Sequence, residues 1–143
     1  MSIWFREFDI EQVRVLLRGT MAELLGIEIV RVGTDHLDGR MPVDERTVQP
    51  HGILHGGASV ALAETLGSIA GTMVVDRERF MIVGQEINAN HLRPVSSGYV
   101  HGSARPIHLG RRSQVWGIEI VDDQQRLACV SRLTIAVIER PPR

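Results

Sequence analysis

The sequence predicts an α+β domain in which one antiparallel sheet wraps around a single long helix. The run from Ala58 to Val75 is apolar and long enough for a helix, and Glu64 is its only charged residue. Strand-like segments lie before and after this run. No internal repeat, linker or low-complexity tract interrupts residues 1–143, so we expect a single domain. A lone apolar helix among strands is best buried by a sheet that curves around it.

The segments before the long helix predict two short helices and two strands. Asp9 is a suitable N-cap for the first helix, and Gly19 is a suitable stop. The two strands alternate apolar and charged residues, which indicates one covered and one wet face. The predicted helices are Asp9 to Leu17 and Met21 to Leu25, and the predicted strands are Ile27 to Val32 and His36 to Val43.

Four more strands are predicted after the helix, and we expect them to form a meander. In the third of them, Trp116, Ile118 and Ile120 fall on one face. An open sheet of this size has edges to protect, so edge-to-edge dimerisation is expected. The four predicted strands are Met81 to Leu92, Gly98 to His108, Ser113 to Val121 and Leu127 to Ile138.

Composition excludes several classes of function. A net charge of -1 argues against a nucleic-acid partner. All 16 basic residues are Arg, which excludes a Schiff-base lysine and a P-loop lysine. Cys129 is the only cysteine, so no intrachain disulfide forms, and its strand-like setting indicates a buried apolar side chain. The charged N-terminus does not resemble a signal peptide, and we expect a cytoplasmic protein.

Two alternatives to a functional Glu64 remain open. The long helix has the length of a membrane span, but a carboxylate at mid-bilayer is costly and flanking aromatic anchors are missing, so we expect no membrane partner. A buried glutamate can also simply pair or cap within the core.

The loop before the long helix is rich in groups that could carry chemistry. The N–H groups of Gly56 and Gly57 lie at the positive end of the helix dipole, where they could hold a carbonyl oxygen as it becomes an oxyanion. Phosphate binding would use the same geometry, but neither GxGxxG nor a P-loop is present. The cluster consists of Gln49, Pro50, His51, Gly52, His55, Gly56 and Gly57.

A metal site and a serine hydrolase are weaker alternatives. His51 and His55 have a spacing that could suit a metal, but they lie on a Pro/Gly loop and no HExxH is formed. Ser59 lacks the GxSxG elbow and a preceding strand. We therefore expect no metal.

Glu64 is the better candidate for the chemistry. It shares a helix face with Ser68, and it lies two turns, about 12 Å along the axis, from the glycine donors. That distance is too long for one helix to act on one carbonyl. The donors and the carboxylate would therefore come from two subunits of a dimer.

These residues carry a family resemblance. The segments MPVDERTVQPHGILHGGASVALAETLGSIAG, GQEINANHLRPV, HLGRRSQVWGIEI and SRLTIAVI resemble hotdog-fold acyl-CoA thioesterases with a catalytic glutamate on the central helix. The similarity is greatest to small bacterial aryl-CoA thioesterases that act on 1,4-dihydroxy-2-naphthoyl-CoA or on misloaded aryl carrier proteins. It covers nearly everything beyond Gly26. It implies the hotdog fold over residues 1–143.

The resemblance also implies roles for single residues. Glu64 would be the nucleophile or the general base, and Gly56 N–H would polarise the thioester carbonyl. Gln49 and His55 would orient the thioester, and Ser68 would position the water or the carboxylate. This chain has His51 where the family commonly has an aromatic or apolar residue lining the acyl pocket. The residues implied in CoA binding are Gly84, His91, Arg93, His108, Gly110, Arg111, Arg112 and Ser113.

We therefore expect a thioester hydrolase that acts without a cofactor, on an aryl or medium acyl group carried by CoA or by an acyl-carrier protein. We expect a homo-oligomer, either a dimer or a dimer of dimers. A hotdog hydratase or dehydratase would need a catalytic His and Asp that HGG alone does not supply. A non-catalytic acyl-CoA-binding protein is the alternative from a different class.

Overall fold

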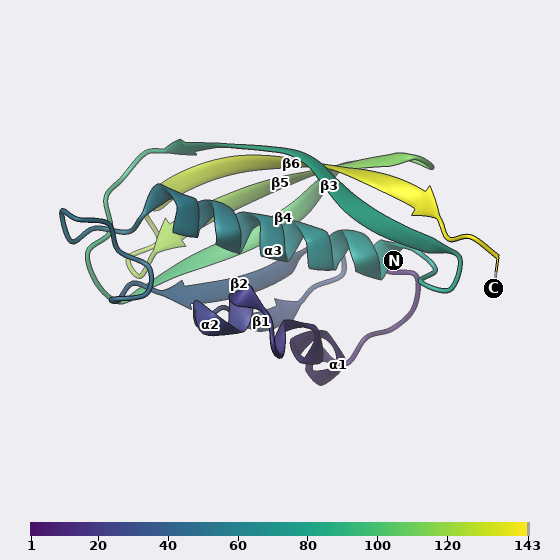
Figure 1. Cartoon of the computed structure of the whole chain (residues 1–143), viewed down its shortest axis with the longest axis horizontal. Coiled ribbons are helices and arrows are strands. Elements are labelled where there is room, and N and C mark those ends of the chain that lie inside the picture. Colours follow the sequence, from purple (N-terminus) through teal and green to yellow (C-terminus); the bar gives the residue numbers. More distant parts are fainter. Residues whose placement is uncertain (143) are drawn as a thin grey trace.

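The long apolar run forms helix α3, Gly56–Val74, and the antiparallel sheet curves around it (Figure 1). The computed structural model describes residues 1–142. Leu62, Leu66 and Met73 of α3 are at most 1% exposed and pack into the core of the sheet. α3 has 19 residues and is long and apolar enough to span a membrane by length and composition. Its place inside the sheet gives these residues a core role instead.

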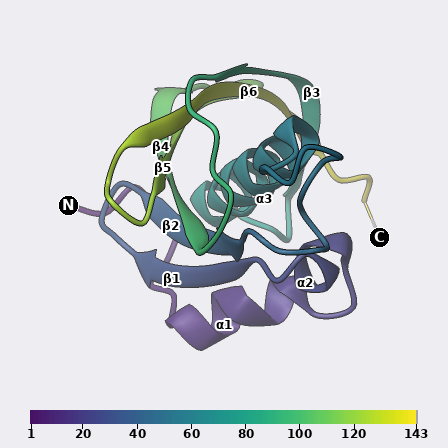
Figure 2. The ribbon, with the colours of Figure 1, turned by 90° about the vertical axis from the view of Figure 1, so that its left-hand side faces the viewer.

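The two predicted N-terminal helices are confirmed. α1 spans Ile10–Arg14 and tightens into a 3-10 turn at Val15–Leu17, while α2 spans Met21–Leu24. Asp9 caps α1 by accepting the N–H of Glu11 at 3.0 Å. In Figure 2 these helices lie below β1, outside the sheet.

All six predicted strands are present, and each ends within one residue of its expected boundary. Their alternating apolar residues face α3. Trp116, Ile118 and Ile120 are at most 1% exposed, as the period of the strand predicts. The strands are β1 Glu28–Val32, β2 Leu37–Pro42, β3 Phe80–His91, β4 Tyr99–Leu109, β5 Ser113–Asp122 and β6 Leu127–Glu139.

The expected meander of the last four strands is wrong for β3. The sheet order is β1-β2-β4-β5-β6-β3, so only β4, β5 and β6 follow one another as neighbours. β2 occupies the edge of β4 that β3 would need, and β3 pairs with β6 instead. The link between β3 and β4 passes the start of α3, where the Val95 carbonyl accepts the N–H of Leu54 at 2.7 Å.

α3 is covered less completely than the sequence suggests. Figure 2 shows the sheet around three sides of α3, with the side between β3 and α2 left open. The residues toward the open side are only half-buried, and they recur at helical spacing. They form what we call the open stripe of α3: Val60, Ala61, Glu64, Thr65, Ser68 and Thr72.

β3 forms one edge of the sheet and borders this open side. Its pairing with β6 shifts between Gly84 and Glu86, which is the signature of a bulge. The bulge changes which residues face α3. Before the bulge, Gly84 faces the helix, where a Cβ atom on it would meet Glu64. After the bulge, His91 faces the helix, and its ring lies against Gly56.

Candidate active site

Glu64 lies at the centre of the candidate site, with its carboxylate against strand β3. A Cβ atom on Gly84 would lie 2.8 Å from Oε1 of Glu64. Glycine therefore leaves the space that the carboxylate occupies, and any larger residue would displace it. A predicted catalytic residue and a predicted CoA-binding residue are thus brought together within one chain.

The Glu64 carboxylate has no intrachain partner within residues 1–142. No salt bridge or hydrogen bond of this region includes it, although six arginines and two histidines do pair with carboxylates. Ser68 lies one turn further along the same stripe, and its carbonyl accepts the Thr72 hydroxyl at 2.9 Å. An unpaired, half-buried carboxylate does not fit the alternative of a structural glutamate paired in the core. It remains available to a ligand.

The start of α3 offers one backbone donor, where the sequence suggests two. His55 is the N-cap, and its Nδ1 accepts the N–H of Gly57 at 2.8 Å. The Gly57 donor is therefore already used. Within residues 1–142, the N–H of Gly56 has no such partner. The neutral His55 ring must carry its proton on Nε2, because Nδ1 is an acceptor here.

His91 closes over the same helix end. Its Nε2 would lie 2.7 Å from a Cβ on Gly56, so the ring packs directly on this glycine. Glycine at this position keeps the backbone N–H unobstructed by a side chain. The structure therefore brings together three of the predicted residues, Gly56, His55 and His91, at the start of α3.

The loop that carries Gln49 is held by its own hydrogen bonds. The N–H of Gln49 donates to Ile53 at 2.9 Å, and the Gln49 carbonyl accepts the N–H of Gly52 at 2.9 Å. The side-chain Oε1 of Gln49 accepts the N–H of His51. His51 itself is exposed. Gln49 is thus near the start of α3 in sequence, but both its backbone carbonyl and its side-chain Oε1 accept hydrogen bonds from within the loop.

Apart from Gly84, the predicted CoA-binding residues fall into two separate groups. His91 and Arg93 lie at the end of β3, beside the start of α3. The β4–β5 hairpin instead lies beside the end of α3, where it shares a groove with Val74 and Val75. The two ends of α3 are about 27 Å apart. The hairpin group comprises His108, Gly110, Arg111, Arg112 and Ser113, in which Gly110 N–H donates to the Ser113 carbonyl at 2.8 Å.

Four other residues carry side chains of a reactive type: Ser59, Cys129, His51 and His55. Ser59 is 3% exposed, which leaves it inaccessible as a nucleophile. Cys129 is 1% exposed, and burial raises the pKa of its thiol, so its predicted role as a buried apolar residue is confirmed. For His51 and His55, residues 1–142 contain no group of three His, Cys, Asp or Glu side chains placed to hold a metal ion.

Two residues at the groove beside the end of α3 escape the sequence analysis. Arg79 and Phe80 line it together with Arg111 and Arg112. In the sequence, Asp76 to Arg79 reads only as a charged turn. The one local signal is an arginine followed directly by an aromatic residue. This signal does not predict that the two residues lie beside the distant β4–β5 hairpin.

Known proteins resemble this chain over almost its whole length. The family model described as the thioesterase superfamily matches residues 51–129. The proofreading thioesterase EntH of Cronobacter turicensis is 53% identical over 136 residues, which cover 95% of this chain and 98% of that protein. The 1,4-dihydroxy-2-naphthoyl-CoA hydrolase of Escherichia coli is 49% identical over 136 residues, covering 95% of this chain and 99% of that one.

A solved structure agrees with these relatives. The crystal structure of a mutant of the thioesterase PA1618 from Pseudomonas aeruginosa superposes with a TM-score of 0.95 and 45% identity, covering 97% of this chain and 100% of that one. The sequence resemblance, the sheet around one central helix and the unpaired glutamate on that helix all agree with this likeness. The chain is a hotdog-fold thioester hydrolase and belongs to the thioesterase superfamily.

Proposed function

We propose that this thioesterase hydrolyses acyl-CoA in a site that two copies of the chain complete. Glu64 of one copy acts as nucleophile or general base, and the Gly56 N–H of the other polarises the thioester carbonyl. The observation that carries this proposal is the unpaired Glu64 carboxylate, which lies on the open stripe of α3 beside the edge strand β3. Both the stripe and the strand edge need a partner surface.

Antiparallel pairing of two β3 edges would unite the separated halves of the site. Within one chain, Glu64 lies against Gly84 and Gly56 lies against His91. His91 follows Gly84 by seven residues along β3. If Gly84 of one chain opposes the partner's His91, the two-fold axis passes between Ile87 and Asn88. The same pairing brings the end of the partner's β3 toward the β4–β5 hairpin of the first chain. Both groups of CoA-binding residues then serve one ligand.

Two protein groups, the Glu64 carboxylate and the Gly56 N–H, carry the proposed hydrolysis. As the carbonyl carbon becomes tetrahedral, its oxygen gains negative charge, which the Gly56 N–H and the dipole of α3 stabilise. Glu64 either attacks this carbon or takes a proton from the attacking water. The carbon–sulfur bond breaks, the thiol leaves, and water supplies the hydroxyl of the acid. No oxidant or phosphate donor enters this balance, so the proposal includes no cofactor.

The proposed substrate is an aryl or medium-chain acyl thioester, and the proposed setting is the cytoplasm. The Escherichia coli relative is named as a hydrolase of an aryl-CoA, 1,4-dihydroxy-2-naphthoyl-CoA, which supports the aryl class. A dimer of dimers is also part of the proposal. Exposed apolar residues on the outer face of the sheet support a second interface, with Met81, Val83 and Ile138 each about two-fifths exposed: 39%, 42% and 43%.

Release of CoA thiol from a panel of aryl and alkyl acyl-CoA substrates tests this function. Steady release, followed with a thiol reagent, is the expected result. Binding of acyl-CoA without release across the panel would favour a non-catalytic binding protein. Loss or gain of a double bond in the acyl chain, with the thioester intact, would favour a hydratase or dehydratase.

A further inference from the structure

One buried side chain, Thr47, ties the start of α3 to the sheet. Thr47 lies between β2 and α3 and is 1% exposed. Its hydroxyl donates to the Pro42 carbonyl at 2.8 Å and accepts the N–H of Asp44 at 3.1 Å. Because Pro42 is the last residue of β2, the hydroxyl fixes this turn to the end of a strand.

The backbone of Thr47 continues this connection to the helix. The Thr47 carbonyl accepts the N–H of His55 at 2.8 Å. His55 is the N-cap of α3, and its Nδ1 accepts the N–H of Gly57 at 2.8 Å. A series of hydrogen bonds therefore runs from β2 through Thr47 and His55 to the first turn of α3. It ends beside the Gly56 N–H, which has no partner within residues 1–142.

Thr47 also lies at the base of the loop that carries Gln49. Directly after it, Val48 and Leu54 form an isolated antiparallel bridge. The Leu54 N–H donates to the carbonyl of Val95, a buried residue of the link between β3 and β4, at 2.7 Å. The loop is thus held from β2 by Thr47 and from the β3–β4 link by Val95.

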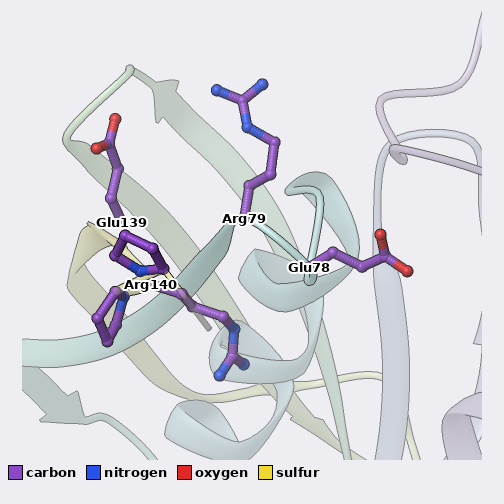
Figure 3. Close-up of a pocket in the computed structure, with 6 residues that line it drawn as sticks. Glu78, Arg79, Glu139 and Arg140 are labelled. Carbon is purple, nitrogen blue, oxygen red and sulfur yellow. The ribbon is translucent and has the colours of Figure 1, made fainter.

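The turn after α3 is held in a different way. Arg140 lines a pocket there (Figure 3). Its Nε donates to the carbonyls of Arg77 at 2.8 Å and Phe80 at 3.2 Å. Arg140 is exposed, so water can replace these hydrogen bonds when the side chain is lost.

Loss of the buried Thr47 hydroxyl has a larger effect. It would leave the Pro42 carbonyl and the Asp44 N–H without their partner, and an unsatisfied polar group away from water is costly. The turn can regain hydrogen bonds only by moving, and this movement shifts the Thr47 carbonyl that holds His55. Catalysis is sensitive to such shifts, because a misplacement of about 1 Å can cost ~100-fold in rate.

We infer that Thr47 is a positioning residue for the hydrolysis, which holds His55 and thereby places the Gly56 N–H at the thioester carbonyl. The inference rests on the proposed role of Gly56. It goes beyond that role, because it gives a function to a residue that touches neither the substrate nor the reacting atoms. The Gly56 N–H stabilises charge that develops in the transition state, so displacing it should lower kcat and leave KM unchanged.

Two substitutions of Thr47 test the inference. Thr47→Val keeps the shape of the side chain and removes the hydroxyl, whereas Thr47→Ser keeps the hydroxyl and removes the methyl group. The substrate is the acyl-CoA that the wild-type protein hydrolyses fastest. We expect Thr47→Val to lower kcat about tenfold with KM within about twofold of wild type, and Thr47→Ser to keep kcat within about threefold. If the valine variant does not fold, Thr47→Ala takes its place with the same expectation.

Thr20→Val is the matched control. The Thr20 hydroxyl donates to the Leu17 carbonyl at 2.7 Å, so the same substitution removes a hydrogen bond of the same kind before α2. It should leave kcat and KM unchanged. An equal loss of kcat in Thr47→Ser and Thr47→Val, an equal loss in Thr20→Val, or no loss in Thr47→Val would overturn the inference and leave the hydrolase intact.

Amide hydrogen exchange gives a readout that does not depend on activity. In the wild-type protein, the His55 and Gly57 N–H groups should exchange at least ~100-fold more slowly than the Gly56 N–H. Thr47→Val should speed exchange at His55 at least ~10-fold while the amide of Ile120, in the centre of the sheet, keeps its wild-type rate.

An unprotected His55 amide in the wild-type protein would contradict the inference without any variant. Unchanged exchange at His55 in Thr47→Val, or equal acceleration at His55 and Ile120, would contradict it as well. Absence of thiol release by the wild-type protein across the acyl-CoA panel would instead overturn the proposed function, and with it a catalytic role for Thr47.

Discussion

Gly84 leaves the space that Glu64 fills, since a Cβ atom at residue 84 would lie 2.8 Å from Oε1 of that glutamate. The contact joins the centre of α3 to the free edge of the sheet. It ties the position of the carboxylate to the backbone of β3, which is also the proposed dimer edge.

Gly84→Ala should therefore reduce turnover without unfolding the protein. The added methyl meets the mobile end of a side chain and not the backbone, so the carboxylate can move aside. Because a misplaced catalytic group loses much of its effect, we expect kcat to fall about ten- to hundredfold with little change in Tm. Gly117→Ala, whose Cβ would meet Ile107 at 3.2 Å, is the control and should keep wild-type turnover.

Glu64→Gln should abolish most of the activity. The amide keeps the size of the side chain but can neither take a proton nor attack the carbonyl, so we expect kcat to fall at least ~100-fold. Circular dichroism should show an unchanged fold. Glu119→Gln, on an exposed position of β5, is the control for loss of one carboxylate. Near-wild-type turnover by Glu64→Gln would remove this residue from the chemistry.

Mixed dimers should show whether the site is shared between chains. A dimer of one Glu64→Gln chain and one Gln49→Ala chain contains one intact site if these residues meet across the interface. We expect about half of the wild-type kcat from such dimers, purified through two different tags. If each site is built within one chain, the mixed dimer should show only the mean kcat of the two single mutants. Observation of that mean would contradict the shared site.

Asp122 should contribute to stability above about pH 4. Its carboxylate accepts the N–H of Arg126 at 2.9 Å, the N–H of Gln124 at 2.9 Å and Nε of Arg126 at 2.8 Å. The backbone bond from Arg126 is the main cause that holds the pKa of Asp122 below its ordinary value of 3.8. A folded-state pKa below the unfolded one stabilises the protein at higher pH, and this contribution is lost as the pH falls through the folded pKa.

Asp122→Asn should consequently lower Tm at pH 7 and lower it less as the pH falls below about 4. Thermal unfolding of both proteins across this range checks the expectation. Glu119→Gln is the control at pH 7, where it should leave Tm close to wild type, since Glu119 is exposed and has no side-chain partner within residues 1–142. An offset of Asp122→Asn that stays constant with pH would contradict the role of the carboxylate charge.

The local elements follow closely from the sequence. The predicted and observed strand ends agree to within one residue. They agree because apolar alternation and turn residues are local signals that span only a few positions. Glu64 stands out because a carboxylate in an apolar helix is costly to bury, and that cost can be read from composition alone. Gly56 stands out because a glycine at a helix start leaves its N–H open.

Strand order and the final partners of polar groups depend on the tertiary structure. β3 pairs with β6, and β2 occupies the edge of β4 that a meander would give to β3; no local sequence pattern indicates this choice between distant segments. His55 takes the N–H of Gly57, so that Gly56 alone keeps its donor. The sequence thus determined which residues could do the chemistry. Long-range packing decided which of them stay unpaired, because a hydrogen bond depends on which groups the fold brings within reach.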